Sequence, residues 1–180
     1  MSVRRWGAGA GAVAVLVATG VWVMWPAGVD ARLWGEVRPV IEARLVAESQ
    51  GTGYGETVPA LKAKWFCRAR ALDLEENGDR IRAGVDTFCV EYGVRDGALV
   101  ECGGSRFPQV VRLKRDTDGD YRVVSREEPP DGEGYAEWEE SRFSFFAESE
   151  IGTDSGTSAA LESAARAHFA LPAGTPVKDC

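Results

Sequence analysis

The residues of this chain that could carry out chemistry are one histidine, four cysteines and several groups of carboxylates. His168 is the only histidine, so a serine or cysteine nucleophile activated by histidine would have to use it. No Gly-x-Ser-x-Gly sequence, the nucleophile turn of many hydrolases, occurs in the chain. A histidine near the C-terminal end of a helix more often stabilises the helix dipole. The sequence therefore predicts no catalytic residue.

Two groups of carboxylates deserve comparison with known chemistry. The stretch Asp116-Thr117-Asp118-Gly119-Asp120 matches part of a calcium loop, but a full loop spreads its ligands over about twelve residues. Because Asp-Gly is a common hairpin turn, we predict a turn here, no metal site and no cofactor. A second group could act as paired acid and base on a glycoside, or could dock a basic partner, but a solvated acidic face is the favoured interpretation. Its members are Glu127, Glu128, Asp131, Glu133, Glu137, Glu139 and Glu140.

The charge of the chain limits its partners. The formal net charge is −7, and Arg4 and Arg5 are the only charged residues before Asp30. The acidic remainder repels a phosphate backbone, which predicts that the protein binds no nucleic acid. By the same reasoning, the average charge would keep the folded part away from an anionic bilayer surface.

The N-terminal segment is predicted to cross a membrane. Trp6–Val29 contains no charged residue, and about 20 apolar residues in a helix span the roughly 30 Å of a bilayer core. Arg4 and Arg5 precede it, so residues 1–29 are interpreted as a signal-anchor with a cytoplasmic N-terminus and an extracellular domain. The alternative is a signal peptide cleaved near Val29-Asp30-Ala31, which would release a secreted protein.

Residues 30–58 are predicted to form a helix and a glycine-rich connection. Apolar residues recur at helical spacing at Leu33, Val37, Ile41 and Leu45, and Pro39 would kink this helix or divide it into two. The helix is expected to cover a sheet face. The alternative is a stalk that raises the domain above the membrane.

Residues 59–180 are predicted to form one exported α+β domain. Its sheet is curved and antiparallel, with four or five strands packed against helices. The predicted strands are Trp65–Leu74, Ile81–Tyr92, Leu99–Cys102, Val110–Lys114 and Tyr121–Arg126, and Gly103-Gly104 is expected to break the chain between the third and the fourth.

The first hairpin is predicted to contain a bulge. With Asn77-Gly78 as a two-residue turn, Leu74 lies opposite Ile81 and Cys67 lies opposite Phe88. The apolar alternation changes phase at a matching point in both strands, which indicates a bulged, strongly twisted hairpin.

The four cysteines are predicted to form disulfides, because their number is even and the domain is expected outside the cell. A single bulge would bring Cys67 opposite Cys89, which leaves Cys102 to hold Cys180 near the C-terminus. Free, buried thiols are the alternative.

The C-terminal part is predicted to contain two helices, Gly134–Phe143 and Ser158–His168, followed by a tail over Leu171–Cys180. Between the helices, Phe143, Phe145 and Phe146 are expected to fill the core.

The pattern over Trp65–Phe146 ends in Tyr121-Arg-Val-Val, Pro129-Pro-Asp-Gly and a helix with tyrosine and tryptophan. It resembles uncharacterised exported, membrane-anchored domains of high-GC Gram-positive bacteria. A small curved sheet wrapped on a helix is also similar to the NTF2-like and cystatin-like folds, which host many functions. The resemblance implies a fold and no activity.

The predicted function is a non-enzymatic binding domain, anchored in the cell membrane by its N-terminal helix. The ligand would be a protein partner or a small apolar molecule, held on the concave side of the sheet by Tyr92, Tyr135 and Trp138 beside Trp65 and Phe88. The alternative, which is favoured for Trp65 and Phe88, is that these aromatic residues belong to the core. Two alternatives remain: a small NTF2-like enzyme with carboxylates in a pocket, and a structural spacer of the cell envelope.

Overall fold

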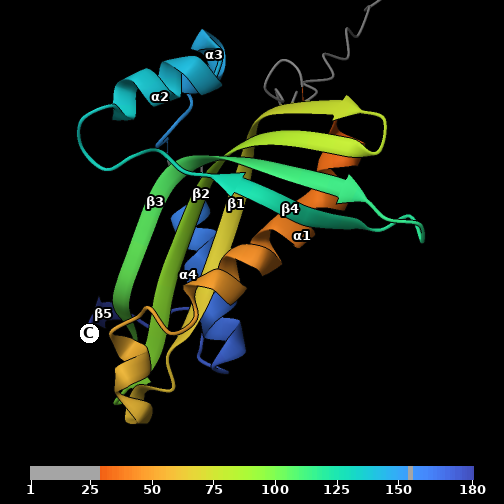
Figure 1. The fold of residues 1–180 in the computed structure, drawn as a ribbon. Helices are drawn as coiled ribbons and strands as arrows, with labels where there is room; N and C mark the ends of the chain where they lie inside the picture. The colour runs from red at the N-terminus through yellow and green to blue at the C-terminus, as the bar shows by residue number, and fades with distance from the viewer. Residues whose placement is uncertain (1–28, 154–155) are drawn as a thin grey trace, which may run out of the picture.

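The structure, a computed structural model, describes residues 29–153 and 156–180, which form a mixed α+β fold around an open five-stranded sheet (Figure 1). Four strands follow in the order β1-β2-β3-β4, all antiparallel, and β5 pairs in parallel with β3. The strands are β1 (Lys64–Asn77), β2 (Arg80–Arg95), β3 (Ala98–Arg115), β4 (Tyr121–Glu127) and β5 (Val177–Asp179). The helices are α1 (Ala31–Ser49), α2 (Tyr135–Arg142), α3 (Phe145–Glu148) and α4 (Thr157–His168), with short 3₁₀ turns η1 (Gly55–Thr57) and η2 (Pro59–Leu61).

The predicted membrane-spanning segment lies outside the described residues, apart from Val29. Of the helices within the described ranges, none is both long enough and apolar enough to cross a bilayer.

Helix α1 packs along one face of the sheet, as predicted for a covering helix. The carboxylate of Asp30 caps it by accepting a hydrogen bond from the Leu33 N–H at 2.7 Å. The helix continues through Pro39, which lies on its exposed side, so the alternative of two short helices is wrong. Its buried residues share one stripe that faces β1, β2 and β3: Leu33, Trp34, Val37, Ile41 and Leu45.

The hairpin of β1 and β2 has a turn shifted by one residue from the prediction. Asn77 pairs with Arg80, so the turn residues are Gly78 and Asp79, and Gly78 takes a φ of 63° that glycine adopts without steric cost. Leu74 consequently faces Ala83 and not Ile81.

The predicted bulge is present and brings two cysteines together. The register shifts between Ala71 and Asp73, after which Cys67 lies directly opposite Cys89 with a Cα–Cα distance of 4.1 Å. The two residues form a disulfide in the core beneath α1. The shifted turn alone would place Cys67 opposite Val90, two residues from the predicted Phe88, and the bulge moves it back by one residue to Cys89.

Strand β3 is continuous where the sequence predicts a break. Gly103 pairs with Glu91 and Gly104 with Val90, so both glycines remain in the ladder. Neighbouring backbone hydrogen bonds from β2 hold this segment extended, and the local preference of glycine for turns is overridden. The irregularity is a register shift between Glu91 and Tyr92.

The C-terminal tail contains a strand that the sequence analysis did not predict. Val177–Asp179 pairs with Leu99–Glu101 of β3, and the Cys180 N–H donates to the Glu101 carbonyl at 2.9 Å. The second disulfide, Cys102–Cys180, fastens this end. Both predicted disulfide pairs are therefore present, and the alternative of free thiols is wrong.

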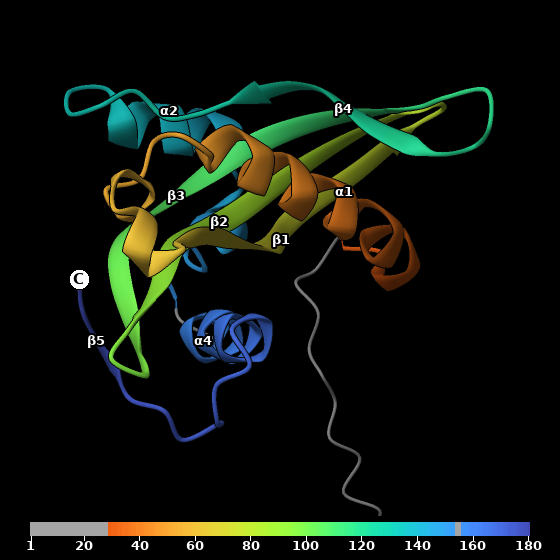
Figure 2. The same ribbon diagram turned by 90° about the horizontal axis from the view of Figure 1, so that it is seen from below.

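The sheet face opposite α1 is covered by C-terminal segments (Figures 1 and 2). Helix α4 packs Leu161 and Ala165 against Val90 and Tyr92 at one end. Nearer the middle, Phe143 and Ala147 pack with Leu72 and Val110 in a third cluster. The expectation that all three phenylalanines fill the core is wrong, because only Phe143 does. Phe145 and Phe146 are 79% and 77% exposed, since α3 turns Ala147 inward instead.

The glycine-rich connection is fixed by a buried carboxylate. Glu91 is fully buried and accepts hydrogen bonds from the backbone N–H groups of Gly55 and Glu56 at 2.8 and 2.7 Å. A side chain on Gly53 would collide with the Glu91 carboxylate. This polar group is satisfied structurally and is enclosed, so it is no candidate for ligand binding.

Removing the second disulfide by Cys102→Ala with Cys180→Ala should lower the free energy of unfolding by about 4.5 kcal/mol, given the 78-residue separation. The same change at Cys67 and Cys89, separated by 22 residues, should cost about 3.4 kcal/mol. Urea unfolding followed by circular dichroism measures both. Reagent-accessible thiols in the denatured, unreduced chain would contradict the pairing.

Candidate functional site

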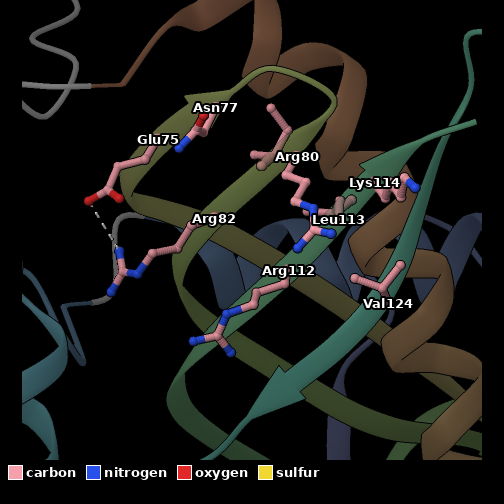
Figure 3. A pocket seen from close by; sticks show the side chains of 9 residues that line it. Glu75, Asn77, Arg80, Arg82, Arg112, Leu113, Lys114 and Val124 are labelled. Carbon is pink, nitrogen blue, oxygen red and sulfur yellow. Dashed lines mark ion pairs between the residues drawn. The ribbon is translucent and has the colours of Figure 1, made fainter.

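A hollow of about 420 Å³ lies at the β1–β2 hairpin end of the sheet, on the face opposite α1 (Figure 3). Its lining comes from all four antiparallel strands, and six of its nine residues are polar or charged. The lining residues are Glu75, Asn77, Arg80, Ile81, Arg82, Arg112, Leu113, Lys114 and Val124. Four of them are cations and one is a carboxylate, a net charge of +3 in a chain whose net charge is −7. We call it the basic hollow.

Strand alternation and register create the basic hollow. Arg80 and Arg82 alternate with Ile81, which packs in the core beneath α1, so both arginines project from the other face. The β2–β3 register then sets Arg80 opposite Lys114 and Arg82 opposite Arg112. On β4, Arg122 lies opposite Lys114 and extends the row of cations.

Carboxylates at the edge of the hollow neutralise its cations only in part. Arg82 contacts Asp73 at 2.7 Å and Glu75 at 3.7 Å. Lys114 lies 3.5 Å from Asp79 at a largely exposed position, where an ion pair contributes little. Within the described residues, Arg80 and Arg122 form no ion pair and are exposed.

Arg112 has a carboxylate partner that is held ionised. It lies 3.4 Å from Glu127, which also contacts Arg142 at 3.1 Å. Partial burial raises the pKa of Glu127, but Arg112 and then Arg142 outweigh that effect, and the pKa of this carboxyl is lowered overall. Glu127 therefore stays charged and, in the structure, holds Arg112 at the rim of the hollow.

A second hollow of about 530 Å³ adjoins the first and shares Glu75 and Arg82 with it. Its other side is formed by Ser141, Arg142 and Ser144, at the end of α2. Arg82 joins the two sides, because its guanidinium also donates to the Arg142 carbonyl. The two hollows form one continuous concave surface between the hairpin and the α2–α3 segment.

The aromatic residues predicted to bind a ligand do not line either hollow. Tyr92 is only 2% exposed and packs against Phe66, with ring centroids 6.0 Å apart. Burial, followed by the charge of Glu101, raises the pKa of the Tyr92 hydroxyl. This position fits core packing beneath α4, and a surface ligand does not reach it.

Tyr135 and Trp138 are half-buried on α2. Trp138 packs edge-on against Phe143 at 5.7 Å. Burial, and then the Glu139 carboxylate, raises the pKa of Tyr135 to about 12. The structure therefore separates Tyr92 from these two residues, with Tyr92 beneath α4 and the pair on α2.

A cluster of buried charges near the middle of the sheet attaches the loop around Glu150 and Thr153 to the strands. The Asp86 side chain is 2% exposed and contacts Arg70 at 3.3 Å and Arg106 at 2.9 Å. The Gly152 N–H also donates to it, and both arginines bind backbone carbonyls of the loop at Glu150 and Thr153. The cluster fastens this loop to β1, β2 and β3, so its role is structural.

The other predicted groups take positions that suit structural roles. In the turn before β4, the Asp116 carboxylate accepts hydrogen bonds from the N–H groups of Asp118 and Asp120, both at 3.0 Å, which confirms the turn. His168 is exposed at the end of α4, edge-on to Phe169 at 4.9 Å. Within the described ranges, no three metal-ligating side chains of His, Cys, Asp or Glu gather.

The sequence analysis missed the basic hollow. Its signal was present as alternating cations, at Arg80 and Arg82 at the start of one strand and at Arg112 and Lys114 near the end of another. Only the register of the sheet shows that these pairs are neighbours.

No protein-family model matches the chain, and a search of curated proteins finds no significant match. The function is therefore inferred from the geometry of the site.

Asp86→Asn should destabilise the fold by about 3 kcal/mol, because it leaves two largely buried arginines without their shared counter-charge. The control Asp96→Asn removes the same charge from an exposed turn with a φ of 50°, which asparagine tolerates, and should change stability by less than about 0.5 kcal/mol. Urea unfolding measures both, and equal effects would contradict the structural role of Asp86.

Proposed function

We propose that this protein is a membrane-anchored, extracytoplasmic binding domain, without catalytic activity, that holds an anionic ligand in the basic hollow. The observation that carries the proposal is the convergence of Arg80, Arg82, Arg112 and Lys114 at the uncovered hairpin end of one sheet face. Arg and Lys side chains recognise carboxylate and phosphate groups through charge-assisted hydrogen bonds. The ligand class is thus anionic, and a small apolar ligand is not favoured.

The location outside the cytoplasm is supported by two features. Two disulfides fasten the fold, which suits an oxidising compartment. The uncharged stretch Trp6–Val29, preceded by Arg4 and Arg5, supports an anchor with its N-terminus in the cytoplasm. A sheet wrapped on the single long helix α1 also supports the analogy with cystatin-like folds, and this analogy implies no activity.

The chemistry of the hollow favours binding over catalysis. Acid–base chemistry on a glycoside needs two carboxylates that face one substrate position. Of the described residues that line the basic hollow, Glu75 is the one carboxylate, and it is paired with Arg82. The concave region around Tyr92, where an NTF2-like active site would be expected, is filled by Leu161 and Ala165 of α4.

The test is anion binding by the full chain in uncharged detergent, with sodium tripolyphosphate as the probe and calorimetry as the measurement. The variant Arg80→Gln, Arg112→Gln, Lys114→Gln should weaken binding at least about tenfold, since each exposed ion pair contributes up to about 1 kcal/mol. Raising the salt from about 0.1 M to 1 M should weaken the wild type similarly.

The matched control removes three cations at exposed positions away from the hollow: Arg38→Gln, Lys64→Gln, Lys178→Gln. It should change the affinity less than about twofold, because charges beyond a Debye length are screened. Equal losses in both triple variants would show a mere effect of net charge and would contradict the proposal. A single cooperative unfolding transition in each variant would confirm that both fold.

A further inference from the structure

We propose that the anion is supplied by the headgroups of a lipid bilayer, and that the basic hollow and the exposed pair Phe145 and Phe146 form one membrane-docking surface. The inference rests on the proposed function, because it names the source of the anion that the hollow binds. It is carried by two observations: an exposed aromatic pair, and an adjoining concave surface that continues into the basic hollow with its net charge of +3.

The aromatic pair is held outward by the fold. Phe145 and Phe146 are 79% and 77% exposed, and their rings lie edge to face at 5.9 Å. Helix α3 is fixed from the other side by buried Ala147, and Ser144 caps it through the Ala147 N–H. Two adjacent exposed phenylalanines are costly in water, and aromatic side chains of this kind enter the interfacial layer of a bilayer.

The pair lies beside the second hollow, whose charges balance (Asp73 and Glu75 against Arg82 and Arg142) and which continues into the basic hollow. Ser144, the residue before Phe145, lines the second hollow, which shares Arg82 and Glu75 with the basic hollow. Figure 1 shows α2 and α3 on the same side of the sheet, the side opposite α1. Apolar side chains next to a cationic surface are the combination that binds anionic membranes.

The charge distribution orients the domain. A chain with a net charge of −7 is repelled by an anionic bilayer, but the lining of the basic hollow carries +3. The attraction acts over about a Debye length, near 8 Å in physiological salt. The lining of the basic hollow is therefore attracted to an anionic bilayer surface at short range.

The experiment footprints the full chain with hydroxyl radicals in the presence of vesicles. One set is phosphatidylcholine alone, and the other contains about 30% phosphatidylglycerol as the anionic lipid. Mass spectrometry should show modification of Phe145 and Phe146 reduced about threefold or more on the anionic vesicles relative to the neutral ones. About 1 M NaCl should abolish that difference.

Two variants test the parts of the surface. Arg80→Gln, Arg112→Gln, Lys114→Gln should restore modification of both phenylalanines, whereas the triple control at Arg38, Lys64 and Lys178 should retain the protection. Phe145→Ser with Phe146→Ser should leave tripolyphosphate binding unchanged but reduce the protection of Arg112. The control for this variant is Tyr54→Ser, which removes another exposed aromatic residue and should not change the protection of Arg112.

The outcomes separate the two proposals. Tripolyphosphate binding that depends on the hollow, without vesicle protection, overturns membrane docking and leaves the proposed function in place. Protection by polyglutamate but not by vesicles also overturns docking and assigns the surface to an acidic protein. Equal protection on both vesicle types overturns the role of anionic headgroups. A tripolyphosphate affinity that the hollow variant does not change overturns the proposed function itself.

Discussion

The mismatch between the length of the strands and the length of the helices determines this architecture. Strand β3 has 18 residues and would extend about 60 Å if flat, whereas the 19 residues of α1 extend about 28 Å. One helix cannot cover such a sheet, so the strands bend and twist around α1, with bulges in each antiparallel pair. The opposite face is left to short C-terminal segments. They cover it from the α4 end to Phe143, and the hairpin end remains open.

Features that depend on neighbouring strands joined by a short turn could be predicted from the sequence. The β1–β2 hairpin, its bulge and the Cys67–Cys89 pair follow from alternation and turn residues within about thirty positions. The continuity of β3 through Gly103 and Gly104 could not, since it depends on hydrogen bonds from β2 that override local preference. The same holds for Phe145 and Phe146, because their exposure is decided by which side of α3 packs on the sheet.

The net charge of the whole chain concealed the basic hollow. A net charge of −7 describes the whole chain, but the basic hollow gathers cations from segments that are about thirty residues apart, such as Arg82 and Arg112. Their proximity is a consequence of the β2–β3 register. That register is set by the turn at Asp96 and Gly97 and by the register shift between Glu91 and Tyr92, both at a distance from the hollow along the strands. Aromatic residues gave a clearer signal in the sequence, but at Tyr92 that signal belonged to the core.

The cation rows also connect ligand binding with the stability of the fold. Like charges placed directly opposite on neighbouring strands destabilise a sheet, and Arg80 faces Lys114 while Arg82 faces Arg112. Glu127 and Asp79 relieve this repulsion from the edge, and the two disulfides stabilise the sheet independently of it. An anion in the basic hollow would contact the cations of β2 and those of β3 at once, and would remove the remaining repulsion between them. Binding there must therefore stabilise the hairpin end of the sheet, because a ligand that binds only the folded state raises its free energy of unfolding.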